Sequence, residues 1–214
     1  MRVEALELGP FGARCVLLGC ERTGAAAVVD PGFEPEAIVE EVERRRLAPG
    51  LIVLTHAHID HAWGAAAVKR AFPRARLLLH PGDRELFGNL AMQARMFGFP
   101  APPPVPEDGE LADGDRLRFG DIELLVRHTP GHSPGHVVLL HEDAERPAAV
   151  VGDVLFAGSI GRTDLWGGSY EQLERSIRQV LYRLPAHTRV VCGHGPDTTI
   201  GEEMASNPFV SAYS

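Results

Sequence analysis

Short apolar runs, broken by turn residues, recur along the whole chain. Runs of this kind predict strands, and alternation with polar residues predicts strands that have one exposed face. The predicted strands cover residues 3–8, 13–20, 25–30, 51–55, 76–80, 116–119, 122–127, 136–141, 148–152 and 189–192. Longer segments with a helical spacing of apolar residues predict helices at 35–47, 64–72, 84–97 and 170–184. Strands that alternate with helices predict an α/β fold.

The charges and apolar residues of these helices add detail. The first predicted helix is acidic at its start and rich in arginine at its end, which suits the helix dipole. The helix at 84–97 carries Leu86, Leu90, Met92 and Met96. We expect these side chains to pack against the core rather than to bind a cofactor.

Length and composition favour one domain. With 214 residues, of which 44% are hydrophobic, the chain can bury a sizeable core, and we expect a single domain over residues 1–214. The proline-rich segment 100–106 is predicted to be a connection inside that domain. No internal repeat or low-complexity segment is evident in the sequence.

Charge and cysteine content indicate which partners and which cellular compartment to expect. A net charge of −8 argues against nucleic acid or an acidic membrane as a partner. No apolar run approaches the roughly 18 residues that a membrane span needs, and the first residues do not resemble a signal peptide. Cys15, Cys20 and Cys192 are odd in number and lack C-x-x-C spacing, so we expect small core residues. These features predict a cytoplasmic protein.

The densest group of reactive side chains is the segment H-x-H-x-D-H at 56–61, which directly follows an apolar run. That run predicts a buried strand, so the segment should be a loop at the strand's C-terminal end, where ligands bind in layered α/β folds. Imidazole and carboxylate groups bind first-row transition metals. The spacing lets His56 and His58 face one point while Asp60 and His61 face a neighbouring point. The segment therefore predicts a metal site.

Three later strands also end in a histidine or an aspartate. His132, Asp153 and His194 each follow a predicted strand, at a turn that contains glycine. One such residue alone would usually be a helix cap or a turn residue. Four strand ends of this kind in one chain of this size indicate a shared site.

The stretches around these residues have a family pattern. They are TPGHSPGH at 129–136, GDVLFAGSIGRTDLWGGS at 152–169 and GHGPDTTIGEE at 193–203. Together with H-x-H-x-D-H, they resemble the metallo-β-lactamase fold superfamily and, within it, glyoxalase II (the hydroxyacylglutathione hydrolases), especially the short bacterial form. The resemblance covers nearly the whole chain. It implies an αββα sandwich in a single domain, with the site at one edge.

The resemblance also implies a binuclear centre, with three ligands for each metal and one that bridges them. The ligands of the first metal are His56, His58 and His132, those of the second are Asp60, His61 and His194, and the bridge is Asp153. We expect two divalent metal ions, zinc first, with iron or manganese also compatible because such ligands discriminate poorly among them. Two ions about 3.5–4 Å apart can share a water and turn it into hydroxide. Asp153, as the bridge, and Asp60, which orients the hydroxide, are the implied catalytic residues.

The implied substrate is a small-molecule thioester, S-D-lactoylglutathione or a related hydroxyacyl thioester. Arg162 and Tyr170 are candidate substrate contacts, although Arg162 has an alternative role in a buried pair with Asp164 that braces the loop. Longer glyoxalase II enzymes add a C-terminal helical region that binds glutathione, whereas this chain ends twenty residues after His194. The thiol moiety of the substrate and the oligomeric state therefore stay open.

A second interpretation of the same resemblance is a mononuclear iron persulfide dioxygenase. It would hold iron through His56, His132 and Asp153 in a facial arrangement. Dioxygenases usually read TPGHT-x-G-C and C-G-R-T-D-F, and the different residues here, His136, Ile160 and Leu165, favour the hydrolase. A metal-dependent nuclease and a lactonase are further alternatives that the sequence favours less. A nuclease would normally have a basic surface. A β-lactamase would usually lack the bridging aspartate.

Three further residues are predicted to support the site or the fold. Asp30 follows a strand, and we expect it to orient a ligand or to form a turn rather than to bind metal. His136 lies in the family-like run and should pack or support a ligand. His80 ends a strand, and its role is left open between structure and the lining of the cleft.

Overall fold

The computed structural model describes residues 1–211, and their contacts divide the chain into two units. Unit 1 comprises Met1–Leu111 and Arg118–Glu123, and unit 2 comprises Ala112–Leu117 and the chain from Leu124 onward. The single domain predicted over 1–214 stays a prediction, and its residues 212–214 lie outside the described part. Among residues 1–211, no helix is long and apolar enough to cross a membrane.

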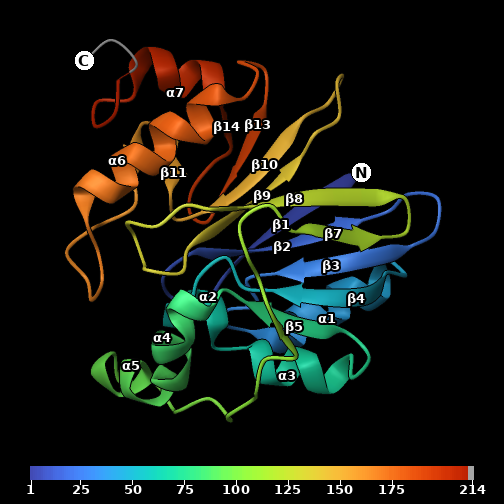
Figure 1. Ribbon diagram of the computed structural model, residues 1–214. Coiled ribbons are helices and arrows are strands. Elements are labelled where there is room, and N and C mark those ends of the chain that lie inside the picture. Colours follow the sequence, from blue (N-terminus) through green and yellow to red (C-terminus); the bar gives the residue numbers. More distant parts are fainter. Residues whose placement is uncertain (212–214) are drawn as a thin grey trace. The chain divides into compact units, whose positions relative to one another are not determined.

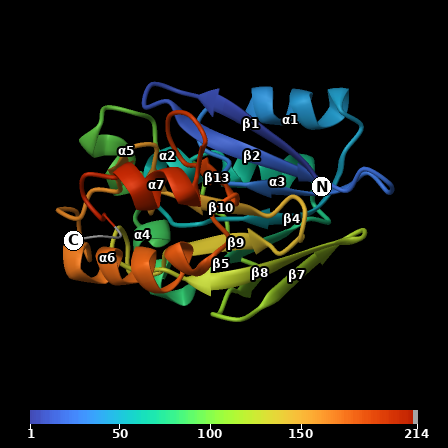
Figure 2. The same cartoon turned by 90° about the horizontal axis from the view of Figure 1, so that it is seen from above.

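The first sheet has six strands in the order β1-β2-β3-β4-β5-β6. The strands are β1 (Arg2–Leu8), β2 (Ala13–Gly19), β3 (Ala25–Val29), β4 (Ala48–Val53), β5 (Arg76–Leu79) and β6 (Gly109–Glu110). The first three pair antiparallel, and β1 and β2 lie side by side in Figures 1 and 2, whereas β3 to β6 pair parallel. Because parallel neighbours end at the same edge, the segments that follow β3, β4 and β5 all begin at one edge of this sheet.

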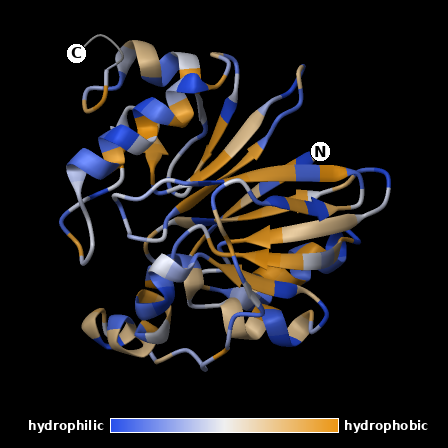
Figure 3. Ribbon diagram, viewed as in Figure 1, coloured by the Kyte–Doolittle hydropathy of each residue, from blue (hydrophilic) through white to orange (hydrophobic). Residues whose placement is uncertain are grey.

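The helices of unit 1 bury their apolar residues in the same core as the sheet. They are α1 (Pro35–Arg44), α2 (Ile59–Ala62), α3 (Ala65–Ala71), η1 (Pro81–Asp83), α4 (Arg84–Gly88) and α5 (Leu90–Met96). Ile38 and Val42 of α1 and Val68 of α3 pack in one cluster with the strand residues Ile52 and Leu77. Each such buried side chain contributes about 1.5–3 kcal/mol. Figure 3 shows the hydrophobic colour concentrated in the strands.

The second sheet also has six strands, in the order β14-β13-β10-β9-β8-β7. Its strands are β7 (Arg116–Phe119), β8 (Ile122–His128), β9 (Val137–His141), β10 (Ala148–Gly152), β13 (Arg189–Cys192) and β14 (Thr198–Thr199), and a separate hairpin joins β11 (Leu155–Phe156) to β12 (Ser159–Ile160). β10 and β13 pair parallel. The residues that follow these two strands, Asp153 and His194, therefore begin at the same edge.

The helices of unit 2 are α6 (Tyr170–Gln179), η2 (Leu181–Arg183) and α7 (Ile200–Ser206). Leu173 and Ile177 of α6 and Ile200 of α7 are buried in one cluster with Val190 of β13. The N-terminus of α7 has a capping box, in which the Thr199 side chain and its partner three residues later satisfy each other's backbone N–H groups.

The predicted helix at 84–97 is wrong as a single element, because it is divided into α4 and α5 at Asn89. The Asn89 side-chain amide donates to the Glu85 carbonyl at 2.9 Å, and asparagine side chains that bind the backbone in this way compete with helix continuation. The expected packing is confirmed for Leu86 and Leu90. It is wrong for the two methionines, since Met92 and Met96 are 61% and 76% exposed.

The predicted helix at 170–184 is also too long, since α6 ends at Gln179 and the short turn η2 follows. Leu184 precedes Pro185, whose ring disfavours helical backbone in the residue before it. The predicted strands are present, with ends that move by a few residues. The sequence pattern did not predict the two-residue strands β6, β11, β12 and β14 or the helices α2 and α7.

Candidate metal centre

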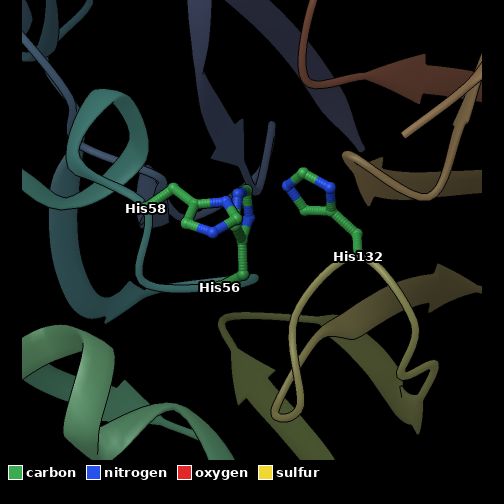
Figure 4. Close-up of side chains that lie close together, drawn as sticks. All are labelled: His56, His58 and His132. Atoms are coloured by element: carbon green, nitrogen blue, oxygen red, sulfur yellow. The ribbon is translucent and has the colours of Figure 1, made fainter. Parts of the chain in front are cut away.

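In unit 1, the segment between β4 and α2 carries the first predicted ligands. Figure 4 shows the rings of His56 and His58 on this segment, and their centroids are 4.9 Å apart. The His61 ring lies 4.2 Å from that of His56. All three side chains are buried. The expectation that the whole segment is a loop is wrong for Asp60 and His61, which lie on the short helix α2.

In His56 and His61, an oxygen lies close to Nδ1, so Nε2 is the nitrogen that would face a metal. His56 Nδ1 lies 3.0 Å from Thr55 Oγ1, and His61 Nδ1 lies 3.2 Å from Asp30 Oδ2. On the opposite side of the His61 ring, Nε2 faces Asp60 Oδ2 at 3.7 Å. Metal-bound histidines in proteins usually have one nitrogen held by an oxygen in this way while the other faces the metal.

Asp30 supports this set, as the sequence predicted. Its carboxylate accepts hydrogen bonds from Thr55 N at 2.7 Å and Thr55 Oγ1 at 2.6 Å, besides its contact with His61. Ligand atoms of Asp30, His56 and His61 lie within 4.8 Å of one another, so these groups could hold a metal ion. Because the Asp30 oxygens already take these donors, we assign Asp30 to orienting the histidines rather than to binding metal.

In unit 2, three strand ends bring His132, Asp153 and His194 together. The Nε2 atoms of His132 and His194 lie 3.6 Å and 3.5 Å from the same oxygen, Asp153 Oδ2. His132 stands on the loop after β8 (Figure 4), and its Nδ1 lies 2.8 Å from the Arg162 carbonyl oxygen. His136 accepts a hydrogen bond from Asp153 N at its Nε2, at 3.1 Å, so it supports the backbone of the predicted bridging residue.

Two glycines explain why the strand ends approach so closely. A Cβ added at Gly193 would lie 2.2 Å from Asp153 Oδ1, and one at Gly161 would lie 1.9 Å from the Asp153 carbonyl oxygen and 3.1 Å from His132 Nδ1. Any other residue at these positions would push the aspartate away. The glycines in the G-H and G-R-T-D patterns are therefore required by packing around Asp153.

The predicted substrate contacts lie at the surface of unit 2. Arg162 forms two hydrogen bonds with Asp164, at 2.7 Å and 2.8 Å, but the expected burial of this pair is wrong, since the side chains are 61% and 68% exposed. The guanidinium lowers the pKa of Asp164 to about 2. The Tyr170 hydroxyl donates to the Phe209 carbonyl oxygen at 2.9 Å. The part of Arg162 that contacts a predicted ligand is its carbonyl group.

The remaining predictions concern cysteines and His80. Cys15, Cys20 and Cys192 are all buried, and none forms a disulfide, which confirms them as core residues. Burial, and then the charge of Asp30, raise the pKa of the Cys15 thiol well above its ordinary value. His80 Nδ1 accepts a hydrogen bond from Gly82 N at 3.1 Å, so this side chain caps the turn after β5.

Two residues that hold the predicted metal-binding segment of unit 1 were not predicted from the sequence. Asp83 accepts a hydrogen bond from Ala57 N at 2.9 Å, and Gln93 accepts one from Ile59 N at 3.0 Å. Asp83 follows a strand end, as the predicted ligands do, and that pattern would have found it. A glutamine inside a helix has no comparable pattern.

The predicted ligands of unit 1 and those of unit 2 both have the chemistry that suits a divalent transition metal. Each unit gathers imidazoles and carboxylates, and in His56, His61 and His132 the Nδ1 atom faces an oxygen. Imidazoles together with carboxylates suit zinc, iron or manganese. The full set of seven ligands, which takes residues from both units, stays a prediction.

Comparisons with known proteins identify the family. Residues 8–194 match the metallo-β-lactamase superfamily. The chain is 36% identical over 215 residues to the hydroxyacylglutathione hydrolase GloC of Haemophilus influenzae, and the match covers 100% of each protein.

Solved structures that resemble this chain point to the same family. The B3 metallo-β-lactamase BLEG-1 has a TM-score of 0.88 at 38% identity, covering 98% of this chain and 99% of that one. TTHA1623 in a di-iron-bound form has a TM-score of 0.85 at 39% identity, covering 97% and 100%. ETHE1 from Myxococcus xanthus has a TM-score of 0.82 at 26% identity, covering 99% and 85%.

These matches span nearly the whole chain, and they confirm the predicted fold class. The two mixed sheets and their helices are consistent with the αββα sandwich expected from the sequence. The chain belongs to the metallo-β-lactamase superfamily.

Proposed function

We propose that this protein is a metal-dependent hydrolase that cleaves a thioester, S-D-lactoylglutathione or a related hydroxyacyl thioester. The seven predicted ligands would act as one binuclear set. The observation that carries the proposal is the orientation of the histidines, because in His56, His61 and His132 an oxygen lies against Nδ1, an arrangement that would direct Nε2 toward a metal. The full-length similarity to GloC supports the substrate class.

The residues of the site would divide the chemistry among them. When bound, two divalent cations would supply a hydroxide near neutral pH and polarise the substrate carbonyl group. Asp153 presents one oxygen to both His132 and His194, which suits the bridging position. Asp60 is proposed to orient the hydroxide. A thiolate is a stable leaving group, so the site needs no strong general acid.

Paired assays on one preparation test this proposal. The purified protein is analysed for metal, stripped with a chelator, and reloaded with zinc, iron or manganese. Each form is mixed with S-D-lactoylglutathione, and the loss of thioester absorbance is followed. We expect about two metal ions per chain and turnover that disappears on stripping and returns on reloading.

Two further substrates distinguish the alternatives. Glutathione persulfide is supplied to the iron form while oxygen uptake is recorded, and a chromogenic β-lactam is supplied to the zinc form. Oxygen uptake with negligible thioester cleavage would contradict the hydrolase and establish the dioxygenase. β-Lactam cleavage that exceeds thioester cleavage would contradict the proposed substrate class.

A further inference from the structure

The metal-binding segment of unit 1 leaves the sheet while it is still buried. Thr55, Ala57 and Ile59 are 0%, 0% and 2% exposed. A buried backbone amide without a partner costs about 1–3 kcal/mol, so the N–H groups of this segment need acceptors that the sheet does not supply.

Side chains from three other elements supply these acceptors. Thr55 N donates to Asp30 Oδ1, at 2.7 Å, in the turn after β3. Ala57 N donates to Asp83 Oδ2, at 2.9 Å, in η1, and Ile59 N donates to Gln93 Oε1, at 3.0 Å, in α5. The backbone is therefore tethered at every second residue.

The tethered amides alternate with predicted ligands. The N–H groups at 55, 57 and 59 donate to the three acceptors, while the residues between them, His56 and His58, carry imidazoles. The backbone is therefore held on both sides of His58. Because a side chain extends from its own Cα, holding the backbone at 57 and 59 restricts where the His58 ring can lie.

Gln93 differs from the two aspartates because it makes hydrogen bonds in both directions. Its Oε1 accepts from Ile59 N, while its Nε2 donates to the Ala57 carbonyl oxygen at 3.1 Å and to the Leu86 carbonyl oxygen at 2.9 Å. One neutral amide therefore holds both sides of His58 and ties this segment to α4. It does so without a charge that would alter the affinity of the nearby ligands for a cation.

We propose that Gln93 is a positioning residue for the metal ligands of unit 1, and that its amide sets the direction of His58 through the backbone on either side. The proposal rests on the metal binding included in the proposed function, and it adds a residue on α5 whose hydrogen bonds go to backbone groups beside His58 and in α4. Outer groups that orient metal ligands change metal affinity by about 10–100-fold.

The test replaces Gln93 by methionine, which keeps the length of the side chain and removes the three hydrogen bonds. We expect zinc affinity, measured by competition with a chelator of known affinity, to fall about 10-fold or more. The visible absorption bands of the cobalt-loaded protein should shift, because they report ligand geometry. In the metal-free protein, hydrogen exchange of the Ile59 amide should become faster.

The matched control is Tyr182→Phe. The Tyr182 hydroxyl donates to the carbonyl oxygens of Glu203 and Val210 at 3.1 Å and 2.8 Å in unit 2, so its loss also removes partly buried hydrogen bonds to the backbone. We expect this variant to lower the unfolding temperature while it keeps the zinc affinity and cobalt spectrum of the unchanged protein. If Gln93→Met does not fold, Gln93→Ala serves instead, since alanine favours the helix and the position is half-buried.

The outcomes separate this inference from the proposed function. If Gln93→Met keeps the zinc affinity and cobalt spectrum of the unchanged protein, the residue is only structural and the inference is wrong. If the unchanged protein binds no metal, the proposed function fails. Ile59 exchange then still tests the tether, and unchanged exchange in Gln93→Met would overturn it.

Discussion

The two units build their predicted ligand sets by different means. In unit 1, four predicted ligands lie within residues 56–61. Backbone N–H groups of this region donate hydrogen bonds to the side chains of Asp30, Asp83 and Gln93, which hold the backbone in place. In unit 2, the predicted ligands come from three separate strand ends, and glycines allow the neighbouring segments of the same chain to approach Asp153 closely. One set is fixed by tethers on a continuous segment, and the other by close packing of distant segments.

This difference predicts different weaknesses. Removal of a side chain that accepts from a buried amide leaves that amide without its partner, which costs about 1–3 kcal/mol and loosens a ligand without excluding it from its place. An added methyl group in a tightly packed site must displace its neighbours, and interiors have little room to relax. The set of unit 1 should therefore be sensitive to removal of polar side chains, and the set of unit 2 to addition of atoms.

The largest effect should follow the loss of the carboxylate shared in unit 2. Asp153→Ala removes the oxygen that faces both His132 and His194, and we expect thioester turnover to fall about 100-fold or more with the fold retained. Turnover, metal content and thermal unfolding are measured together. Asp143→Ala, which removes a half-buried carboxylate that accepts hydrogen bonds from Glu145 N and Arg146 N in the same unit, is the control and should keep its turnover. A folded Asp153→Ala protein with unchanged turnover would rule out the bridging role.

The next effect tests packing alone. Gly193→Ala places a methyl group 2.2 Å from Asp153 Oδ1, so the carboxylate or β13 must shift. Displacement of a reacting group by about 1 Å can cost about 100-fold in rate, and we expect a loss of turnover of about 10–100-fold. Gly50→Ala is the matched control, because a Cβ at Gly50 meets nothing within 4 Å. Equal turnover in the two variants would show that unit 2 tolerates added atoms at its strand ends.

The same contrast explains what the sequence could predict. Apolar runs predict strands such as β4 and β10, because the apolar residues that are buried in these strands are themselves visible in the sequence. Two-residue strands such as β6 and β14 exist only through their partners, so the pattern of their own residues contains no evidence for them. The break at Asn89 depends on a side chain that competes with the backbone, which apolar spacing does not reveal.

The candidate site follows the same rule. Ligands that directly follow strands, such as His132 and Asp153, could be found because the position after a buried strand is itself a pattern. Gln93 could not be found, because its role depends on the meeting of α5 with a segment more than thirty residues earlier. The burial expected for Arg162 was wrong because an Arg-Asp spacing shows that a pair can form but not whether the loop is covered.

The smallest effect should come from the exposed pair Arg162–Asp164. Its side chains neither hold the backbone of the predicted ligands nor pack closely against them. Arg162 holds the pKa of Asp164 at about 2, below the ordinary value of 3.8, so the carboxylate is charged in the folded protein at all pH values above about 3. A lowered pKa contributes stability that is present above the unfolded value and is lost as the pH falls through the folded value. Solvent screens exposed pairs, so the contribution is small.

We therefore expect Asp164→Asn to change the unfolding temperature of the metal-free protein by no more than about 1–2 °C at pH 7. The difference from the unchanged protein should stay constant between pH 7 and about pH 5, and it should narrow as the pH falls below about 4. Zinc affinity should not change, because the group that contacts His132 is the Arg162 carbonyl oxygen, which the substitution keeps. Thermal unfolding with chelator present measures the first two quantities, and chelator competition measures the third. A 10-fold loss of zinc affinity would mean that the pair holds the Arg162 backbone in place, and unit 2 would then depend on a polar tether as unit 1 does.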